Sequence, residues 1–138
     1  MVITAILADG APPTHPAARA AFDAASRLVC CDGAYRKARA LGRLPDLVVG
    51  DGDSLSAADR AALGERFVSI AEQETNDLDK ALALCRADDP SGWRDATVIV
   101  GATGKREDHT IGNVYRALAA EVPVVSEHGT FWPVRGRL

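Results

Sequence analysis

Short, continuous apolar segments alternate with segments of helical periodicity along this chain of 138 residues. The apolar segments predict β-strands at residues 2–7, 28–31, 46–49, 67–70, 97–100 and 122–125. The intervening segments predict helices at residues 14–26, 35–41, 56–63 and 76–86, and from about 109 onward. Continuous apolar strands are typical of a parallel sheet that is covered by helices on both faces. The pattern therefore predicts a doubly wound, three-layer α/β/α domain with a mainly parallel sheet of about six strands.

Two of the predicted helices carry an apolar stripe. In the helix at 76–86 the stripe begins at Leu78 and recurs at the i+3, i+4 and i+7 positions. In the last helix it consists of Ile111, Val114, Tyr115 and Leu118. We expect both stripes to pack on the sheet, and Lys80 to face solvent beside Asp77. Residues 130–132 favour a further strand that leads into a turn at 133–136.

Acidic residues follow four of the predicted strands. They are Asp32 after the second strand, Asp51 and Asp53 after the third, several residues of 72–77 after the fourth, and several of 101–109 after the fifth. The carboxyl ends of parallel strands meet at one edge of a sheet, where ligands bind. Carboxylates gathered at one edge repel each other unless a divalent cation lies among them. Glycines with Lys105 and Arg106 at a helix N-terminus suit phosphate, so the edge predicts metal-dependent phosphoryl-type transfer from a nucleotide.

Each of these residues also has a purely structural interpretation. Glycine and aspartate form turns, so Asp51 and Asp53 fit a tight turn. Asp77 offsets the positive end of a helix dipole, Asp108 fits a helix N-cap, and His109 fits the first turn of a helix. Isolated turns and caps do not explain why acidic residues follow several strands at the same predicted edge.

Composition narrows the classes of function. The formal net charge of −3 predicts no basic face for nucleic acid. The three cysteines, Cys30, Cys31 and Cys85, fit neither a disulfide framework nor a zinc site, so we expect reduced thiols in the core. No apolar run approaches the roughly 18 residues of a membrane span, and the chain begins with a strand-like segment instead of a signal sequence. We therefore expect a cytoplasmic protein that contacts neither nucleic acid nor membrane.

Four motifs, taken together, resemble the thiamine pyrophosphokinase family. They are Cys31-Asp32-Gly33, residues 45–54 with Asp51 and Asp53, residues 73–82 with Gln73 and Asp77, and residues 101–113 with Arg106 and Asp108. The motifs occur in the family's order and cover about residues 27–113. The resemblance implies that ATP and Mg²⁺ bind this domain and that pyrophosphate passes from ATP to the hydroxyl of thiamine, releasing AMP.

The family's functional residues can be placed on these motifs position by position. The resemblance implies that Asp51, Asp53 and Asp77 are the magnesium ligands. It also implies that these acids form the catalytic centre together with Arg106 and Asp108. The implied nucleotide-binding residues are Asp32, Gly33, Gln73, Thr75, Gly101, Thr103, Gly104, Lys105, His109 and Asn113. Lys105 stands where the family commonly has a glycine, which affects how closely the backbone approaches a phosphate.

Members of this family continue into a second, all-β domain that helps to form the thiamine pocket, usually across a dimer. The resemblance therefore implies a catalytic α/β domain at residues 1–126, the start of a truncated β segment at 127–138, and a homodimer. Two alternative functions remain. One is a non-catalytic Mg²⁺–nucleotide-binding module that lacks the thiamine-binding domain. The other is a haloacid-dehalogenase-type phosphatase, in which the first aspartate of an Asp-x-Asp pair is the nucleophile.

Overall fold

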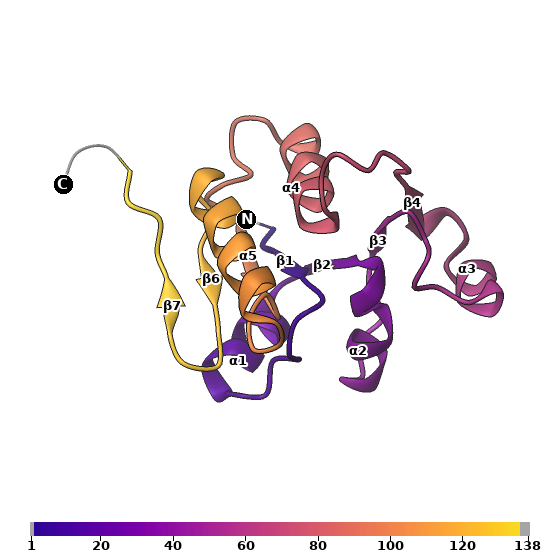
Figure 1. Ribbon diagram of the computed structural model, residues 1–138, viewed down its shortest axis with the longest axis horizontal. Coiled ribbons are helices and arrows are strands. Elements are labelled where there is room, and N and C mark those ends of the chain that lie inside the picture. The colour runs from indigo at the N-terminus through magenta and orange to yellow at the C-terminus, as the bar shows by residue number, and fades with distance from the viewer. Residues whose placement is uncertain (1, 136–138) are drawn as a thin grey trace.

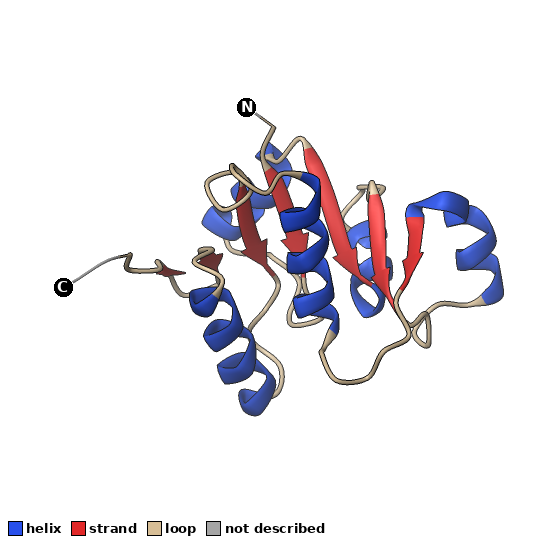
Figure 2. Cartoon of the chain, turned by 90° about the horizontal axis from the view of Figure 1, so that it is seen from above, coloured by secondary structure: helices blue, strands red, loops and turns tan. Residues whose placement is uncertain are grey.

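The computed structural model describes residues 2–135 and has three layers, with helices on both faces of one sheet (Figure 1; Figure 2). Its strands are β1 (Thr4–Leu7), β2 (Arg27–Cys31), β3 (Leu47–Gly50), β4 (Phe67–Ser69), β5 (Thr97–Val100), β6 (Val124–Val125) and β7 (Thr130–Phe131). Its helices are α1 (Pro16–Ala24), α2 (Tyr35–Ala40), α3 (Ala57–Leu63), α4 (Asp77–Asp88) and α5 (Glu107–Ala119). The predicted fold class is confirmed. None of the helices in this part of the chain is both long and apolar enough to cross a membrane.

The sheet has the strand order β4-β3-β2-β1-β5-β6-β7, and every pair is parallel except β6 with β7. Neighbouring residues of β1 face opposite layers. Ile6 packs with residues of α4 and α5, whereas Ala5 and Leu7 pack with residues of α1, α2 and α3. The strand order changes direction at β1, which lies between β2 and β5. In open α/β sheets, ligands bind at this point, beyond the carboxyl ends of the strands.

The seventh strand, β7, lies within the further strand predicted at residues 130–132, and the sixth strand is shorter than predicted. The prediction of a strand from Val122 was wrong because Val122 completes the end of α5. Its N–H donates to the carbonyl of Ala117 at 2.9 Å, and the N–H of Glu121 donates to that of Leu118 at 3.0 Å. With Glu121 at a φ of 60°, these bonds form a Schellman motif. The predicted turn at 133–136 includes Gly136, which lies outside the described residues.

The apolar stripe predicted for the last helix does not pack on the sheet. Ile111 is 71% exposed and Tyr115 is 74% exposed, whereas the buried residue of α5 is the small Ala117. The reason is that α4 packs on the long strands β2 and β3, while α5 lies toward β6, which has only two residues (Figure 1). The stripe of α4 is buried as predicted, at Leu78, Ala81, Leu82 and Cys85.

The three cysteines are buried and do not form disulfides, as expected. Burial raises the pKa of Cys30 to about 12 and that of Cys85 to about 11. Burial also raises the pKa of Cys31. Thiols with raised pKa values stay protonated at neutral pH and are poor nucleophiles. These cysteines are therefore packing residues of the core and not catalytic nucleophiles.

Candidate active site

The carboxyl ends of β1, β2, β3 and β5 meet along one edge of the sheet, as the strand order requires. A cleft of about 710 Å³ opens there between the end of β1, the start of α4 and the start of α5. The predicted site residues that line this cleft are Asp77, Thr103, Lys105, Arg106, Asp108, His109 and Asn113. The others belong to loops at the same edge but do not line the cleft: Asp32, Gly33, Asp51, Asp53, Gln73, Thr75, Gly101 and Gly104.

The buried carboxylate of Asp32 organises the loop after β3. Asp32 is only 4% exposed, and it accepts a hydrogen bond from the N–H of Gly52 at 2.9 Å. A Cβ at Gly50 would lie 2.7 Å from the Asp32 carboxylate, so a side chain does not fit there. Gly52 has a φ of 85°, a conformation that favours glycine. The loop therefore turns tightly around Asp32 and presents Asp51 at the edge.

Asp51 and Asp53 differ in how firmly the loop holds them. Oδ1 of Asp51 accepts the N–H of Asp53 at 3.0 Å. This bond is the main cause that lowers the pKa of Asp51, and side-chain contacts with Asp32 and Gln73 lower it further. Asp51 is half-buried, whereas Asp53 is exposed. Asp51 is therefore held beside Asp32, while the side chain of Asp53 lies in solvent.

Asp77 brings a third carboxyl group to Asp32 and Asp51 from the first turn of α4. The helix begins after Asn76, whose side chain accepts the N–H of Asp79 at 2.9 Å in a capping box. Burial, followed by the contact with Asp32, raises the pKa of Asp77 to about 7. Carboxylates this close repel each other when ionised, and a divalent cation among them relieves that repulsion.

Asp32, Asp51 and Asp77 form what we term the acidic cluster. Its hard oxygen donors fit Mg²⁺, which is commonly held by one or two carboxylates. Within residues 2–135, no three Asp, Glu, His or Cys side chains are already arranged around a common point that could hold a metal ion. The predicted ligands Asp51, Asp53 and Asp77 thus have suitable chemistry and lie at the same edge, but their side chains are not gathered around one point in this structure.

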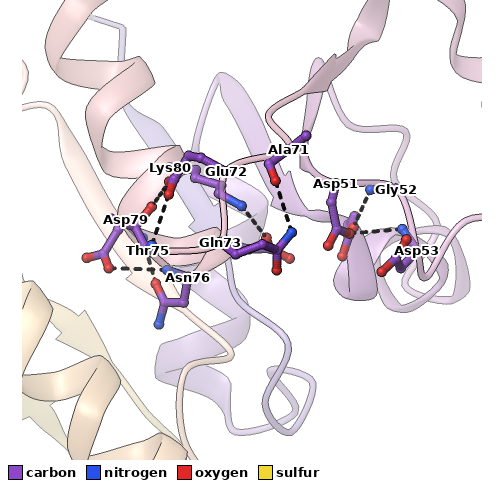
Figure 3. A network of polar contacts seen from close by, with 12 residues as sticks. Asp51, Gly52, Asp53, Ala71, Glu72, Gln73, Thr75, Asn76, Asp79 and Lys80 are labelled. Atoms are coloured by element: carbon purple, nitrogen blue, oxygen red, sulfur yellow. Dashed lines mark hydrogen bonds and ion pairs between the residues drawn. The ribbon is translucent and has the colours of Figure 1, made fainter.

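The loop between β4 and α4 lies beside Asp51 of the acidic cluster (Figure 3). Glu72 holds its turn by accepting hydrogen bonds from the N–H of Thr75 at 3.1 Å and from the Thr75 hydroxyl. The side chain of Gln73 donates to the carbonyl of Ala71 at 3.0 Å and also lies within hydrogen-bonding reach of Asp51. Gln73 is therefore close enough to contact a molecule or ion that binds at the acidic cluster. The side chain of Thr75, in contrast, is hydrogen-bonded to Glu72 within the same loop.

The loop after β5 connects the cleft to the N-terminus of α5. Gly101 and Gly104 have φ angles of 68° and 88°, which favour glycine at both positions. Arg106 is the N-cap residue of α5, and its guanidinium donates to both carboxylate oxygens of Asp108 at 3.1 and 2.7 Å. The N-cap interpretation of Asp108 was therefore wrong, and the helix begins at Glu107, ahead of the predicted start.

The Arg106–Asp108 pair lies at the mouth of the cleft. The two side chains are 69% and 62% exposed, and Arg106 lowers the pKa of Asp108. Exposed ion pairs contribute little to stability, so Arg106 can leave Asp108 for a bound phosphate at small energetic cost. Deeper in the cleft, the Asn113 amide is fixed by donating to the carbonyl of Ala102 at 3.0 Å. His109 is exposed on the first turn of α5.

The contribution of β1 was missed from the sequence. Asp9 and Gly10 follow this strand and line the cleft. Lys37 of α2 donates to the Asp9 carboxylate at 2.6 Å and to the Gly10 carbonyl at 2.7 Å, and Lys105 lies 4.0 Å from Asp9. The available signal was Asp-Gly directly after an apolar run, the same pattern that pointed to Asp32.

The expectation that Lys80 faces solvent was wrong. Lys80 is only 5% exposed, and its Nζ lies 3.9 Å from Oδ1 of Asp77. Side chains on a helix lean toward its N-terminus, and here that direction leads from Lys80 to the acidic cluster. The expected proximity to Asp77 is confirmed, but the lysine lies on the buried side of the helix.

Gly10→Ala is expected to destabilise the fold by about 1–3 kcal/mol, because the new Cβ overpacks the loop after β5. This Cβ would lie 2.5 Å from the carbonyl oxygen of Gly101 and 2.6 Å from that of Thr103. Chemical denaturation measures the change. Gly129→Ala is the matched control, since no atom lies within 4 Å of its added Cβ. Equal stability of the two variants would contradict the close contact between these loops.

Comparisons with known proteins give one consistent family. The model of the thiamin pyrophosphokinase catalytic domain matches residues 18–125. Thiamin pyrophosphokinase from Geobacillus thermodenitrificans is 26% identical with a TM-score of 0.67, and the match covers 90% of this chain and 59% of that one. A thiamin pyrophosphokinase family protein from Enterococcus faecalis is 23% identical with a TM-score of 0.67, covering 88% and 60%. Yeast thiamin pyrophosphokinase is 14% identical with a TM-score of 0.66, and the match covers 91% of this chain and 58% of that one.

The chain spans about three fifths of the length of these solved structures, which have 58–60% of their residues in the match. A search of curated protein sequences gave no match. The structures below 25% identity support the fold, and the family assignment depends on the catalytic-domain match.

Proposed function

The chain belongs to the thiamin pyrophosphokinase catalytic-domain family, and from this premise we propose that its cleft binds Mg²⁺·ATP for transfer of pyrophosphate to the hydroxyl of thiamine, with AMP as the second product. The observation that supports the proposal is the acidic cluster beside a cleft lined by Lys105 and Arg106. Carboxylates for a divalent cation next to cations for phosphate are what phosphoryl transfer requires. The choice of thiamine as acceptor comes from the family.

In the proposed reaction the thiamine hydroxyl oxygen attacks the β-phosphorus of ATP, the bond from this phosphorus to the α-phosphate oxygen breaks, and AMP leaves. Mg²⁺, when bound, neutralises phosphate charge. Asp51, Asp53 and Asp77 would hold it, and Arg106 and Lys105 would stabilise negative charge on the transferred group. The hydroxyl proton goes either to Asp108 or to a carboxylate of the metal site. The pKa of Asp108 is lowered by Arg106, so Asp108 becomes the stronger base once Arg106 has moved to phosphate.

The other parts of the family's function stay predictions. They comprise the nucleotide contacts of Asp32, Gly33, Gln73, Thr75, Gly101, Thr103, Gly104, His109 and Asn113, the thiamine pocket, the homodimer and the cytoplasmic location. The division into residues 1–126 and 127–138 also stays a prediction. In the described part of the second segment, β7 pairs with β6 at the sheet edge, and residues 136–138 lie outside the described residues.

Product analysis tests the proposed function. The protein is incubated with ATP, Mg²⁺ and thiamine, and the products are separated by chromatography. Formation of AMP and thiamine diphosphate only when thiamine is present supports the proposal. Release of inorganic phosphate without AMP would identify a phosphatase, and Mg²⁺·ATP binding without any product would identify a nucleotide-binding module.

Arg106→Ala is expected to weaken ATP binding about tenfold or more, as for loss of hydrogen bonds to charged groups. AMP binding should change little, because the monophosphate lacks the β- and γ-phosphates that the guanidinium contacts. Calorimetric titration of both nucleotides measures the two effects. Arg86→Ala, an exposed change in the last turn of α4, is the control. Equal losses of ATP and AMP affinity would place Arg106 away from the transferred group.

A further inference from the structure

Lys80 is a buried cation that the proposed reaction does not use. It is 5% exposed on the face of α4 that also buries Leu78, Ala81 and Leu82. Lysine is almost never fully buried unless it is paired, because the long side chain otherwise carries its ammonium group to water. Removing an ammonium ion from water costs several kcal/mol, so opposite charge nearby must compensate it.

The compensation comes from several carboxylates and not from one close partner. In the described part of the chain, Lys80 forms an ion pair with Asp77, and 3.9 Å is too long for a direct hydrogen bond. The Asp53 N–H is the main cause that lowers the pKa of Asp51, and the Thr75 hydroxyl is the main cause for Glu72; the charge of Lys80 adds to both effects. The charge of Lys80 also opposes the rise that burial causes in the pKa of Asp77. Lys80 therefore contacts Asp77 and lies near enough to the carboxylates of the loops after β3 and β4 to act on them as well.

This sharing distinguishes Lys80 from the other lysines at the edge. Lys37 forms close contacts of 2.6 and 2.7 Å with Asp9 and Gly10, as in an ordinary ion pair. Lys105 is exposed and lies 4.0 Å from Asp9. Neither of their ion pairs includes a residue of the acidic cluster. Among these three lysines, only Lys80 forms an ion pair with the acidic cluster. Its ammonium group therefore reduces the repulsion between the carboxylates of the cluster, as a bound divalent cation would.

We propose that Lys80 is a resident counter-cation of the metal site: it holds Asp51 and Asp77 together while no metal is bound, and it opposes binding of a bare divalent cation. This inference rests on the proposed Mg²⁺·nucleotide site. It adds a reason why that site would prefer a metal–nucleotide complex to a bare metal ion. A bare cation adds two positive charges beside the ammonium group. A metal–triphosphate complex carries net negative charge, so Lys80 repels the first and attracts the second.

Two consequences separate this role from that of a simple structural salt bridge. Without Lys80, the carboxylates lose their resident positive charge and repel each other, so the metal-free protein becomes less stable. The same carboxylates then attract a bare divalent cation more strongly. A lysine that served only to stabilise the helix would lower stability without strengthening metal binding.

The test is binding of Mn²⁺ alone, followed by electron paramagnetic resonance, to the wild type and to Lys80→Met. We expect Lys80→Met to bind Mn²⁺ about tenfold more tightly, as for removal of one charge near a divalent ion. Its Tm without metal should be lower than that of the wild type. Lys80→Arg keeps the charge and should bind Mn²⁺ within about threefold of the wild type, a difference of less than 1 kcal/mol.

Arg27→Met is the matched control, because Arg27 is a partly buried cation at the start of β2 that pairs with Asp88 at 2.6 Å. It removes the same net charge at the amino ends of the strands and should leave Mn²⁺ affinity unchanged. Unchanged or weaker Mn²⁺ binding by Lys80→Met would overturn the proposal. So would an equal gain in Arg27→Met, because net charge alone would then explain the effect.

A second comparison applies even if Lys80→Met does not fold alone. Asp77→Asn removes one carboxylate, so Lys80→Met in that background should lower the Tm less than in the wild type. It should still strengthen Mn²⁺ binding relative to Asp77→Asn, and no gain there would equally overturn the proposal. None of these measurements uses ATP or thiamine, so failure of the proposed function is seen separately, in the product analysis.

Discussion

Asp77→Asn should make the metal-free protein more stable than the wild type at pH 8, by about 1–2 kcal/mol after allowance for the partial exposure of the side chain. Burial and the neighbouring Asp32 raise the pKa of Asp77 from its usual 3.8 to about 7 in the folded protein. Between these two values the folded state binds more protons than the unfolded state, so the stability of the wild type falls as pH rises. Asparagine resembles the protonated carboxyl group and removes that loss.

Denaturant unfolding at pH 4 and pH 8 measures the effect. The difference between variant and wild type should be small at pH 4, where Asp77 is protonated in the folded state, and should grow toward pH 8. Asp23→Asn, on the exposed surface of α1, removes one carboxylate without touching the acidic cluster. It weakens only the exposed ion pair with Arg19, so it should shift stability by less than about 0.5 kcal/mol. A variant that is less stable than the wild type at pH 8 would show that Asp77 serves the helix and not the cluster.

Asp51→Asn should lower the affinity for Mg²⁺·ATP on the order of 100-fold. Replacing a residue that only hydrogen-bonds to a metal ligand already lowers metal affinity by about 10–100-fold, so loss of a ligand itself should reach the upper end of this range. The expected loss is large because asparagine keeps one oxygen but carries no negative charge to attract the cation. The fold should survive, since asparagine Oδ1 can still accept the N–H of Asp53 that Asp51 accepts at 3.0 Å. The affinity for ATP in the absence of Mg²⁺ should change little.

Calorimetric titration of ATP with and without Mg²⁺ measures both affinities, and circular dichroism checks the fold. Asp23→Asn again serves as the control. It changes the net charge by the same amount, but on α1, which packs on the opposite face of the sheet from α4. If Asp51→Asn kept wild-type affinity for Mg²⁺·ATP but lost stability, the loop after β3 would be a structural turn instead of a metal site.

The order of the elements and the edge that carries the site could be predicted from the sequence. Continuous apolar runs mark strands that helices cover on both faces, and parallel strands bring their carboxyl ends to one edge. Asp32, Asp51 and Asp77 could therefore be placed together although the first and the last are 45 positions apart. The hydrogen bond from the N–H of Gly52 to Asp32 fixes how these carboxylates are arranged. It depends on the pairing of β2 with β3, which the spacing of apolar residues does not reveal.

Burial was the property that periodicity described least well. A stripe such as Ile111 and Tyr115 shows that one face of a helix is apolar, but not that a strand lies beneath it. Lys80 illustrates the converse error. Its charge indicated solvent, and its neighbour Asp77 could be expected from the spacing, but its burial depends on the packing of α4 on β2 and β3, which only the folded chain shows. Both errors arise because burial depends on tertiary neighbours.

Paramagnetic broadening by Mn²⁺·ATP, observed in the amide NMR spectrum of the isotope-labelled protein, tests the claim that this edge is a metal–nucleotide site most directly. We expect amide signals of residues 50–53 and 77–80 to broaden first and those of 103–106 next, while signals of α1 and Gly129 persist. Asp51→Asn should abolish this pattern at the same concentrations. Broadening that is uniform, or that is centred on the outer faces of α4 and α5 near Arg86 and Tyr115, would contradict a metal–nucleotide site at this edge.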